Sequence, residues 1–269
     1  MKRVAIITVA GISSRFNTGM AEDEKVLKCL YTEGNAKDTL LYHMLMKLSY
    51  ADRIIIVGGY KYDALKQYIE ESLSALVLPE LKEKIRLVYN DHYEDLSSGY
   101  SLYMGLKAAF EEGDISDVMF AEGDLDVDGE SLETVINTDA TVLTYNHEPI
   151  KADKAVVLYV DGENRYHYAF NSSHGLLSIR DSFSAIYNSG QIWKFTDIEV
   201  LKLANEVFIE KHRVDTNLAI IQEYLNHTTA DRVKVFPFVC WTNCNPRDDY
   251  RYIKERWDHE ESERTVIGC

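Results

Sequence analysis

The chain has 269 residues, of which 44 are acidic and 29 are basic, and its formal net charge at pH 7 is −15. This length predicts roughly one to two domains with a substantial core, and contents of 46% hydrophobic and 27% charged residues argue against a disordered chain. The acidic excess disfavours partners such as nucleic acid or a membrane surface, which need clustered Lys and Arg, but a local cationic pocket can still bind a small anion.

Strands and helices are predicted to alternate through the first half of the chain. Continuous apolar, β-branched runs of strand length are typical of strands buried on both faces. Apolar residues spaced three and four apart predict helices between them. The expected strands are residues 4–9, 53–57, 85–89 and 118–121, and the expected helices are residues 40–48, 62–73 and 101–110. This β-α-β order predicts an α/β fold with a mostly parallel sheet and helices on both faces.

The second half has a less regular pattern. Apolar runs at residues 140–144 and 155–159 and a turn at residues 161–164 predict a hairpin, and residues 233–238 predict another strand. Helices are expected at residues 196–208, with Thr196 as N-cap, at residues 216–225, and at residues 247–257 after Pro246. Repeats, low-complexity tracts and Pro- or Gly-rich linkers are absent from the sequence. One domain over residues 1–269, with a mixed α+β insertion, is therefore expected.

The sequence gives no sign of export or membrane insertion. It has no run of about 18 apolar residues, and the apolar run after Met1-Lys2-Arg3 fits a strand better than a secretory signal. Its four cysteines form no C-x-x-C pair, which indicates reduced thiols. We therefore expect a cytoplasmic protein.

The turn after the first strand is the first candidate site. It contains Ala10, Gly11, Ser13, Ser14 and Arg15. Ligands of parallel sheets bind at the carboxyl ends of strands, where glycine lets the backbone approach a phosphate and arginine can hold its oxygens. Lys25 and Lys28 follow within reach. The alternative is an ordinary glycine turn beside surface lysines.

A cluster of carboxylates follows the fourth strand. Glu122, Asp124, Asp126 and Asp128 lie within seven residues, and such crowded charges favour a hard cation such as Mg²⁺, which takes one or two carboxylates together with substrate phosphates. A calcium loop of the EF-hand type is disfavoured, because Val135 stands where the twelfth-position Glu is required. A solvated acidic loop is the remaining alternative.

A polar segment follows the third strand and precedes a helix. Asn90, Ser98, Tyr100 and Ser101 lie in it, and free N–H groups at the helix start can bind a polar ligand. The alternative is an ordinary N-cap at Ser98 or Ser101.

These segments, in this order, resemble the nucleotidyltransferase superfamily, which activates small phosphorylated molecules with a nucleoside triphosphate. The matching pieces are the A-G-x-x-S-R turn at residues 10–15, a following lysine at Lys25 or Lys28, the Gly59-Tyr60 pair, the polar segment around Asn90, Asp124, and a closing motif at residues 241–250. The closest resemblance is to phosphocholine-type cytidylyltransferases of bacterial surface-polysaccharide pathways. It implies a Rossmann-like, GT-A-like fold with an NTP-binding half at residues 1–130, an acceptor-binding half at residues 131–235, and a closing strand and helix at residues 236–269.

The resemblance also implies a role for each matched residue. Catalytic groups would be Arg15, Lys25 and Lys28, and a Mg²⁺ cofactor would be held by Asp124, Asp126 and Asn243. The nucleotide, most readily CTP, would contact Ala10, Gly11, Ser13, Ser14, Gly59, Tyr60, Asn90, Ser98 and Ser101. The acceptor, a small phosphate or phosphonate, would contact Tyr100, Gln191, Trp193, Lys194 and Trp241.

Several positions depart from the family pattern. Ser13 replaces a glycine of the usual opening, and Asn243 or Asn245 stands where many relatives have a second metal aspartate. Gln191 replaces an acidic residue of the acceptor region, which argues against a strongly cationic acceptor. An aromatic cage for a quaternary ammonium could use Tyr100, Tyr103, Tyr187, Trp193 and Trp241.

The implied reaction joins a phosphate or phosphonate oxygen of the acceptor to the α-phosphorus of CTP and releases pyrophosphate. A sugar-1-phosphate nucleotidylyltransferase is the first alternative. A nucleotide-sugar glycosyltransferase would also use an acidic D-x-D such as residues 124–126, but it needs fewer cations than a triphosphate does. An inactive nucleotide sensor is the non-enzymatic alternative.

Overall fold

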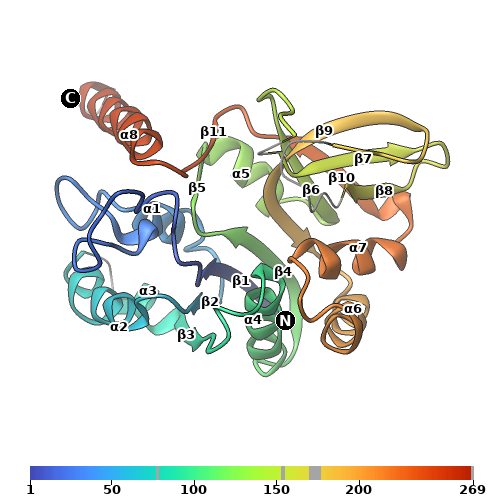
Figure 1. Ribbon diagram of the computed structural model, residues 1–269, viewed down its shortest axis with the longest axis horizontal. Coiled ribbons are helices and arrows are strands. Elements are labelled where there is room, and N and C mark those ends of the chain that lie inside the picture. The colour runs from blue at the N-terminus through green and yellow to red at the C-terminus, as the bar shows by residue number, and fades with distance from the viewer. Residues whose placement is uncertain (77–78, 153–154, 170–176, 268–269) are drawn as a thin grey trace.

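Strands and helices alternate along the chain of the computed structural model, which describes residues 1–76, 79–152, 155–169 and 177–267 (Figure 1). The strands are β1 (Lys2–Val9), β2 (Arg53–Gly58), β3 (Ile85–Tyr89), β4 (Ile115–Glu122), β5 (Leu125–Val127), β6 (Thr141–Asn146), β7 (Val157–Asp161), β8 (Tyr166–Ala169), β9 (Phe183–Phe195), β10 (Val233–Pro237) and β11 (Trp241–Asn243). The α-helices are α1 (Leu40–Lys47), α2 (Tyr62–Gln67), α3 (Pro79–Lys84), α4 (Ser98–Phe110), α5 (Gly129–Ile136), α6 (Ile198–Lys211), α7 (Leu218–Asn226) and α8 (Arg247–Ile267). A π-helical turn at Tyr68–Ser72 continues α2, and short 3₁₀ turns occupy Lys28–Leu30, Leu73–Ala75 and Ala230–Arg232.

A nine-stranded sheet forms the centre of the molecule. Its main path has the order β10-β6-β9-β4-β1-β2-β3, and β7 pairs with β9 and β8 beside it. Strand β9 runs antiparallel to both β4 and β6, whereas the other pairs of the main path are parallel. Six of the seven strands on this path therefore share one direction, which confirms the predicted α/β class with a mostly parallel sheet.

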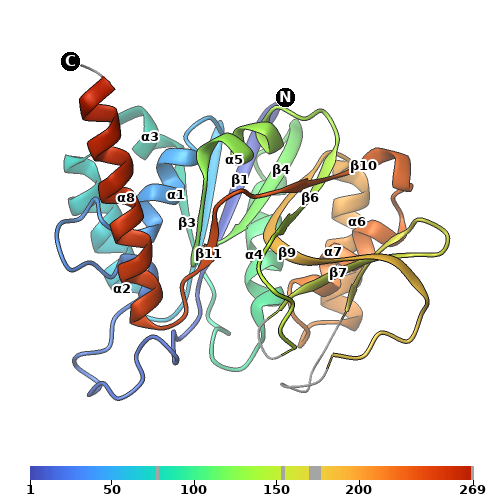
Figure 2. The same cartoon turned by 90° about the horizontal axis from the view of Figure 1, so that it is seen from above.

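Helices cover both faces of this sheet, as the view from above shows (Figure 2). Successive side chains of a strand point to opposite faces, so Val4 and Ile6 of β1 pack with α4, α6 and α7, while Ala5, Ile7 and Val9 pack with α1, α2, α5 and α8. The middle residues of β1, β2 and β4 are apolar and buried because neither face of the sheet meets water there. This packing fixes the carboxyl ends of β1 and β4 beside each other.

The order of the strands reverses between β1 and β4. From β1 the chain continues to β2 and β3 on one side and then crosses to β4 on the other. Connections leave such a point in opposite directions and open a crevice at the carboxyl ends of the strands. The turn after β1 and the acidic segment after β4, both singled out in the sequence, lie at this crevice.

The structure corrects several predicted boundaries. Helix α4 begins at Ser98 rather than at residue 101, and the N-cap of α6 is Asp197, which accepts a hydrogen bond from the Val200 N–H, rather than Thr196. The segment after β4 is not a plain loop, since residues 125–127 form β5, which pairs with β11. Helix α3 and the full length of β9 carry no periodic pattern strong enough to predict them. Helix α5 has Leu132, Val135 and Ile136 at helical spacing after its N-cap Asp128, but it is absent from the predicted helices.

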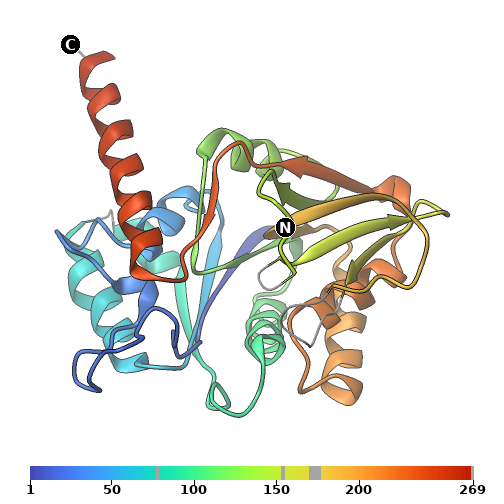
Figure 3. The same ribbon diagram turned by 45° about the horizontal axis from the view of Figure 1, so that its top comes forward.

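Helix α8 is longer than expected. It runs ten residues beyond Trp257 and projects from the body of the molecule (Figure 3). Its first half is anchored, because Tyr250, Ile253 and Trp257 are buried in the core. Among the helices of the described residues, none is long and apolar enough to cross a membrane.

Candidate active site

A cavity of about 420 Å³ opens at the crevice between β1 and β4. Its walls come from segments far apart in the sequence. They are the turn at residues 10–16, the segment at residues 27–29, the loop and helix start at residues 93–101, the strand end at residues 122–124, and Asn245. All three candidate segments of the sequence therefore meet in one place.

The turn after β1 is held in an unusual backbone conformation. Ser13 has a φ of +54°, in the left-handed region that glycine ordinarily occupies. Its hydroxyl accepts a hydrogen bond from the Lys28 N–H at 3.4 Å. Asn17 ties the same two segments together, since its side chain donates to the Val26 carbonyl at 2.9 Å and accepts from the Val26 N–H at 3.0 Å. Asn17 was not among the predicted site residues, although a buried amide is the group that can satisfy a neighbouring backbone in this way.

The two candidate lysines lie in different places. Lys28 lines the cavity, and its Nζ lies 2.7 Å from Asp124 Oδ2. Lys25 does not line the cavity and instead pairs with the exposed carboxylate of Glu22 at 2.5 Å. Because a lysine acts on phosphate only within contact distance, Lys28 is the better placed of the two.

The residues that could hold a divalent cation form a smaller set than predicted. The Oδ1 atom of Asp124 is buried and has no hydrogen-bond partner. Asn245 lines the cavity near it, and its amide donates to the Asn243 side chain at 2.8 Å, which leaves the Asn245 carbonyl oxygen available. No group of three His, Cys, Asp or Glu residues within the described ranges could hold a metal by itself. One carboxylate and one amide suit Mg²⁺, which completes its shell with water and substrate phosphates.

Asp126 and Asn243 do not reach the cavity, contrary to the predicted metal set. Asp126 lies in β5, after the turn that carries Asp124, and its carboxylate pairs instead with Lys47 at 2.7 Å and with Arg256. Burial alone would raise the pKa of Asp126, but the two cations outweigh it and hold that pKa below its ordinary value. The carbonyl oxygen of Asn243 is occupied by Asn245, and its amide donates to Gln191 at 3.4 Å.

Glu122 is a cavity residue that the sequence reading placed only in the acidic cluster. Its Oε1 accepts a hydrogen bond from the Asn217 amide at 2.8 Å, and Asn217 also bonds Ser98. Burial, followed by the charge of Asp124, raises the pKa of Glu122 to about 7. This shift toward the neutral form reduces the repulsion between Glu122 and Asp124. Asn217 comes from the far half of the chain, so the sequence offered no local signal for this contact.

The polar segment after β3 forms the wall opposite the metal candidates. Asn90 is buried, and its amide donates to the Ser101 hydroxyl at 2.9 Å while its oxygen accepts from the His92 N–H. Ser98 and Ser101 line the cavity. Asn90 therefore does not line the cavity itself, but it orients Ser101, which does.

Glycine is required where the turn and β2 meet. A Cβ on Gly59 would lie 2.5 Å from the Cβ of Tyr93, and the neighbouring Tyr60 N–H donates to the Ala10 carbonyl at 3.0 Å. The Gly59-Tyr60 pair thus shapes the cavity through its backbone.

The predicted acceptor residues do not gather in the cavity. Trp193 is fully buried, stacks on Phe120 with ring centroids 5.1 Å apart, and donates to the Tyr168 hydroxyl. Lys194 is also buried and donates to the carbonyls that end α5, at Ile136 and Thr138. Both side chains are buried in the interior, because they belong to β9, which lies between β6 and β4 in the sheet.

The other acceptor candidates lie around the cavity rather than in it. Tyr100 contacts His92 and lies under Arg213, whose Cζ is 5.5 Å from the ring centroid. The Trp241 indole donates to the Gly190 carbonyl. Gln191 is buried with a left-handed φ of +57° and connects through Asn243 to Asn245. Tyr100 packs with Tyr103, Tyr187 with Tyr145 and Trp193 with Phe120, so these contacts do not build the predicted aromatic cage.

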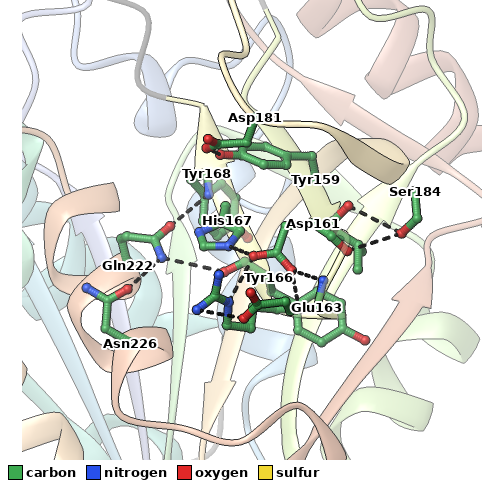
Figure 4. A network of polar contacts seen from close by, with 12 residues as sticks. Tyr159, Asp161, Glu163, Tyr166, His167, Tyr168, Asp181, Ser184, Gln222 and Asn226 are labelled. Carbon is green, nitrogen blue, oxygen red and sulfur yellow. Dashed lines mark hydrogen bonds and ion pairs between the residues drawn. The ribbon is translucent and has the colours of Figure 1, made fainter.

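A separate polar network lies on the hairpin of β7 and β8 (Figure 4). Asp161 accepts hydrogen bonds from the N–H groups of Glu163 and Arg165 and from the side chains of Arg165 and His167. This carboxylate is fully used within its own turn. The network therefore stabilises the predicted hairpin rather than offering a second site.

Comparison with known protein families shows which family the chain belongs to. Residues 24–257 match the family described as a domain of unknown function, DUF6564. The chain belongs to the DUF6564 family. A search of curated proteins finds no match to this DUF6564 chain.

Solved structures share the fold of this DUF6564 chain. The inositol-1-phosphate CTP transferase from T. maritima matches with a TM-score of 0.61 and 17% identity, over 92% of this chain and 91% of that one. The CTP:phosphocholine cytidylyltransferase from Streptococcus pneumoniae matches with a TM-score of 0.61 and 16% identity, over 96% and 100%. A UDP-glucose pyrophosphorylase complexed with UDP-glucose matches with a TM-score of 0.67 and 12% identity, over 97% and 100%. The predicted resemblance to nucleotidyltransferases is thus confirmed at the level of the fold.

Proposed function

We propose that this DUF6564 chain is a nucleotidyltransferase that transfers a cytidylyl group from CTP to a small phosphate- or phosphonate-bearing acceptor and releases pyrophosphate. The observation that carries the proposal is the meeting of the glycine turn, Lys28 and Asp124 in one cavity. A triphosphate needs such a combination of cations and a metal carboxylate, whereas a nucleotide sugar needs less positive charge.

The reaction requires little proton transfer. An oxygen of the acceptor phosphate forms a bond to the α-phosphorus, and the bond from that phosphorus to the bridging oxygen of the β-phosphate breaks. The attacking oxygen is already an anion, so no general base is needed. Catalysis then rests on positioning and on neutralising charge as the pyrophosphate leaves.

The residues of the cavity divide these tasks. The backbone at Gly11 and Ser13 lets the triphosphate approach closely, and Arg15 binds its oxygens. Lys28 would neutralise charge at the α-phosphate, because it lines the cavity and contacts Asp124. Asn90 and Ser101 position the nucleoside on the opposite wall.

A divalent cation fits the residues present. The unpartnered Oδ1 of Asp124 and the carbonyl of Asn245 would hold Mg²⁺. When bound, the ion would neutralise phosphate oxygens. Asp124 could bind Lys28 and the ion together, since its Oδ2 contacts Lys28 and its Oδ1 has no partner.

A second candidate is a sugar-1-phosphate nucleotidyltransferase. It is favoured by Asn245, whose amide side chain lines the cavity. Amide groups donate to and accept from hydroxyls, whereas a quaternary ammonium needs carboxylates or open aromatic faces. Either product would be made where CTP is available, in the cytoplasm, and would supply surface-polysaccharide or related synthesis.

The decisive experiment measures pyrophosphate release. The purified chain is mixed with Mg²⁺ and each of four nucleoside triphosphates, against phosphocholine, aminoethylphosphonate, inositol 1-phosphate and glucose 1-phosphate. Release that depends on one acceptor supports the proposal and names the substrate. Tight CTP binding without release for any acceptor would instead indicate a sensor, and turnover of a nucleotide sugar would indicate a glycosyltransferase.

A further inference from the structure

Arg247, the first residue of α8, differs from the other cations in the first half of that helix. Within the described residues its guanidinium has no ion pair and no hydrogen bond, and its buried Nε is without a partner. Its Cζ lies 4.7 Å from the centroid of the Tyr31 ring and 5.6 Å from that of Phe16. The three following cations of the same helix, by contrast, all pair with carboxylates, and they are Arg251, Lys254 and Arg256.

This guanidinium lies beside the cavity. Phe16, the residue after Arg15, lines the cavity. Asn245, two residues before Arg247, lines it too. Figure 3 shows the start of α8 next to the N-terminal loops. Arg247 itself is not among the lining residues, but its guanidinium contacts Phe16, which is one of them.

The first turn of a helix carries partial positive charge, which disfavours a cation there, and cation–π attraction to the two aromatic rings offsets this cost. Stacking engages only the faces of the guanidinium, so the N–H donors on its edge stay free for an anion with two oxygens. A phosphate is the anion that suits this geometry best.

We propose that Arg247 binds the β- and γ-phosphates of the triphosphate, and so holds the pyrophosphate group as it leaves. The inference rests on the proposed function and adds a binding residue outside the turn after β1. Tyr31 and Phe16 keep the guanidinium extended and ready, which reduces the entropy lost on binding. Contacts to the α-phosphate and the nucleoside remain with Lys28 and the opposite wall.

The test compares Arg247→Gln with Arg251→Gln, which removes an exposed arginine one turn further along the same helix. Calorimetry with inorganic pyrophosphate in the presence of Mg²⁺ should show at least tenfold weaker binding for Arg247→Gln and less than a twofold change for Arg251→Gln. CTP should weaken in the same way, while CMP, which lacks the β- and γ-phosphates, should bind all three proteins alike. Arg247→Lys should recover part of the affinity, and equal thermal midpoints show that the variants are folded.

Three results would overturn the inference. They are equal pyrophosphate affinity in Arg247→Gln and wild type, an equal loss of CMP affinity, and a wild-type protein that binds no pyrophosphate. The proposed transfer reaction fails separately, through the absence of acceptor-dependent pyrophosphate release. A wild type that binds pyrophosphate through Arg247 but releases none would therefore reject the reaction and keep the phosphate site.

Discussion

The ammonium of Lys28 lies 2.7 Å from the carboxylate of Asp124, although the two residues are 96 positions apart in the chain. This contact joins the segment after the glycine turn to the end of β4. It also puts a cation and a metal-binding group within reach of one phosphate chain. Lys28 is 14% exposed and Asp124 24% exposed at their side chains, so the pair is shielded yet open to a ligand.

Replacing Lys28 should abolish most of the activity, whereas replacing Lys25 should not. We expect Lys28→Met to lower kcat/KM by about 10²–10³-fold, because one well-placed charge that stabilises a transition state contributes about that much. Lys25→Met, which loses only an exposed pair with Glu22, should stay within about threefold of wild type. Steady-state pyrophosphate release measures both variants, and a larger loss in Lys25→Met would reverse the assignment.

Removing the metal ligands should change the requirement for Mg²⁺. Chelation with EDTA should stop turnover, and Mg²⁺ should restore it. Asp124→Asn should lose at least about 10²-fold in kcat, since a neutral amide binds a hard cation poorly. Asn245→Ala should keep more activity but need more Mg²⁺ for half-saturation. The measurement is turnover across a Mg²⁺ titration, and near-normal turnover of Asp124→Ala at saturating Mg²⁺ would refute the role of that carboxylate.

Asp126 should matter for stability rather than for binding. It is buried between Lys47 and Arg256 and joins β5 to α1 and α8. Asp126→Ala leaves two partly buried cations without their partner, which should cost about 3–5 kcal/mol of unfolding free energy. Urea unfolding measures this loss. Calorimetry at a temperature where the variant is folded should show an unchanged affinity for CTP, and a selective loss of Mg²⁺-dependent binding would return Asp126 to the metal site.

His43 should make the fold sensitive to acid. Its ring stacks on Trp257 at a centroid distance of 3.6 Å, and burial lowers the pKa of His43 to about 4, with the charge of Lys47 adding to the effect. The unfolded chain binds this proton near the ordinary histidine pKa of about 6.5. The stabilisation is therefore complete above that pH and is lost as the pH falls toward 4.

The size of this effect can be isolated by substitution. Between pH 7.5 and 4.5, wild type should lose about 2–3 kcal/mol more unfolding free energy than His43→Phe, which keeps an aromatic ring but cannot titrate. Urea unfolding of both proteins across this range gives the difference, and other titrating groups cancel in it. Parallel curves for the two proteins would show that His43 is not buried as a neutral group.

Much of the fold follows from local patterns. The apolar run of residues 4–9 predicts a strand covered on both faces, and β1 is covered in that way. The turn at residues 161–164 predicts the hairpin of β7 and β8, because the residues that favour a turn act within four positions of the chain. Strand β9 was missed because its burial comes from β4 and β6, which are distant in sequence.

The acceptor residues show why a linear motif can mislead. Gln191, Trp193 and Lys194 are close in sequence, but their side chains make contacts in different parts of the structure, and all three are buried. The spacing of a motif reports chain position only. Which face meets the cavity depends on the register of β9 against its neighbours.

By itself the sequence determined the order of the candidate site segments along the chain and the local charge of the first of them. Residues 1–28 hold five basic and three acidic groups in a chain of net charge −15, and the glycine turn and Asp124 each follow a buried strand. Only the tertiary structure decided that Lys28 faces Asp124, that Asn217 holds Glu122, that Asp126 turns away, and that Arg247 has no carboxylate partner among the described residues. The reason is physical: strand alternation and helix periodicity act within a few residues, whereas each of these relationships depends on groups that folding brings together from distant parts of the chain.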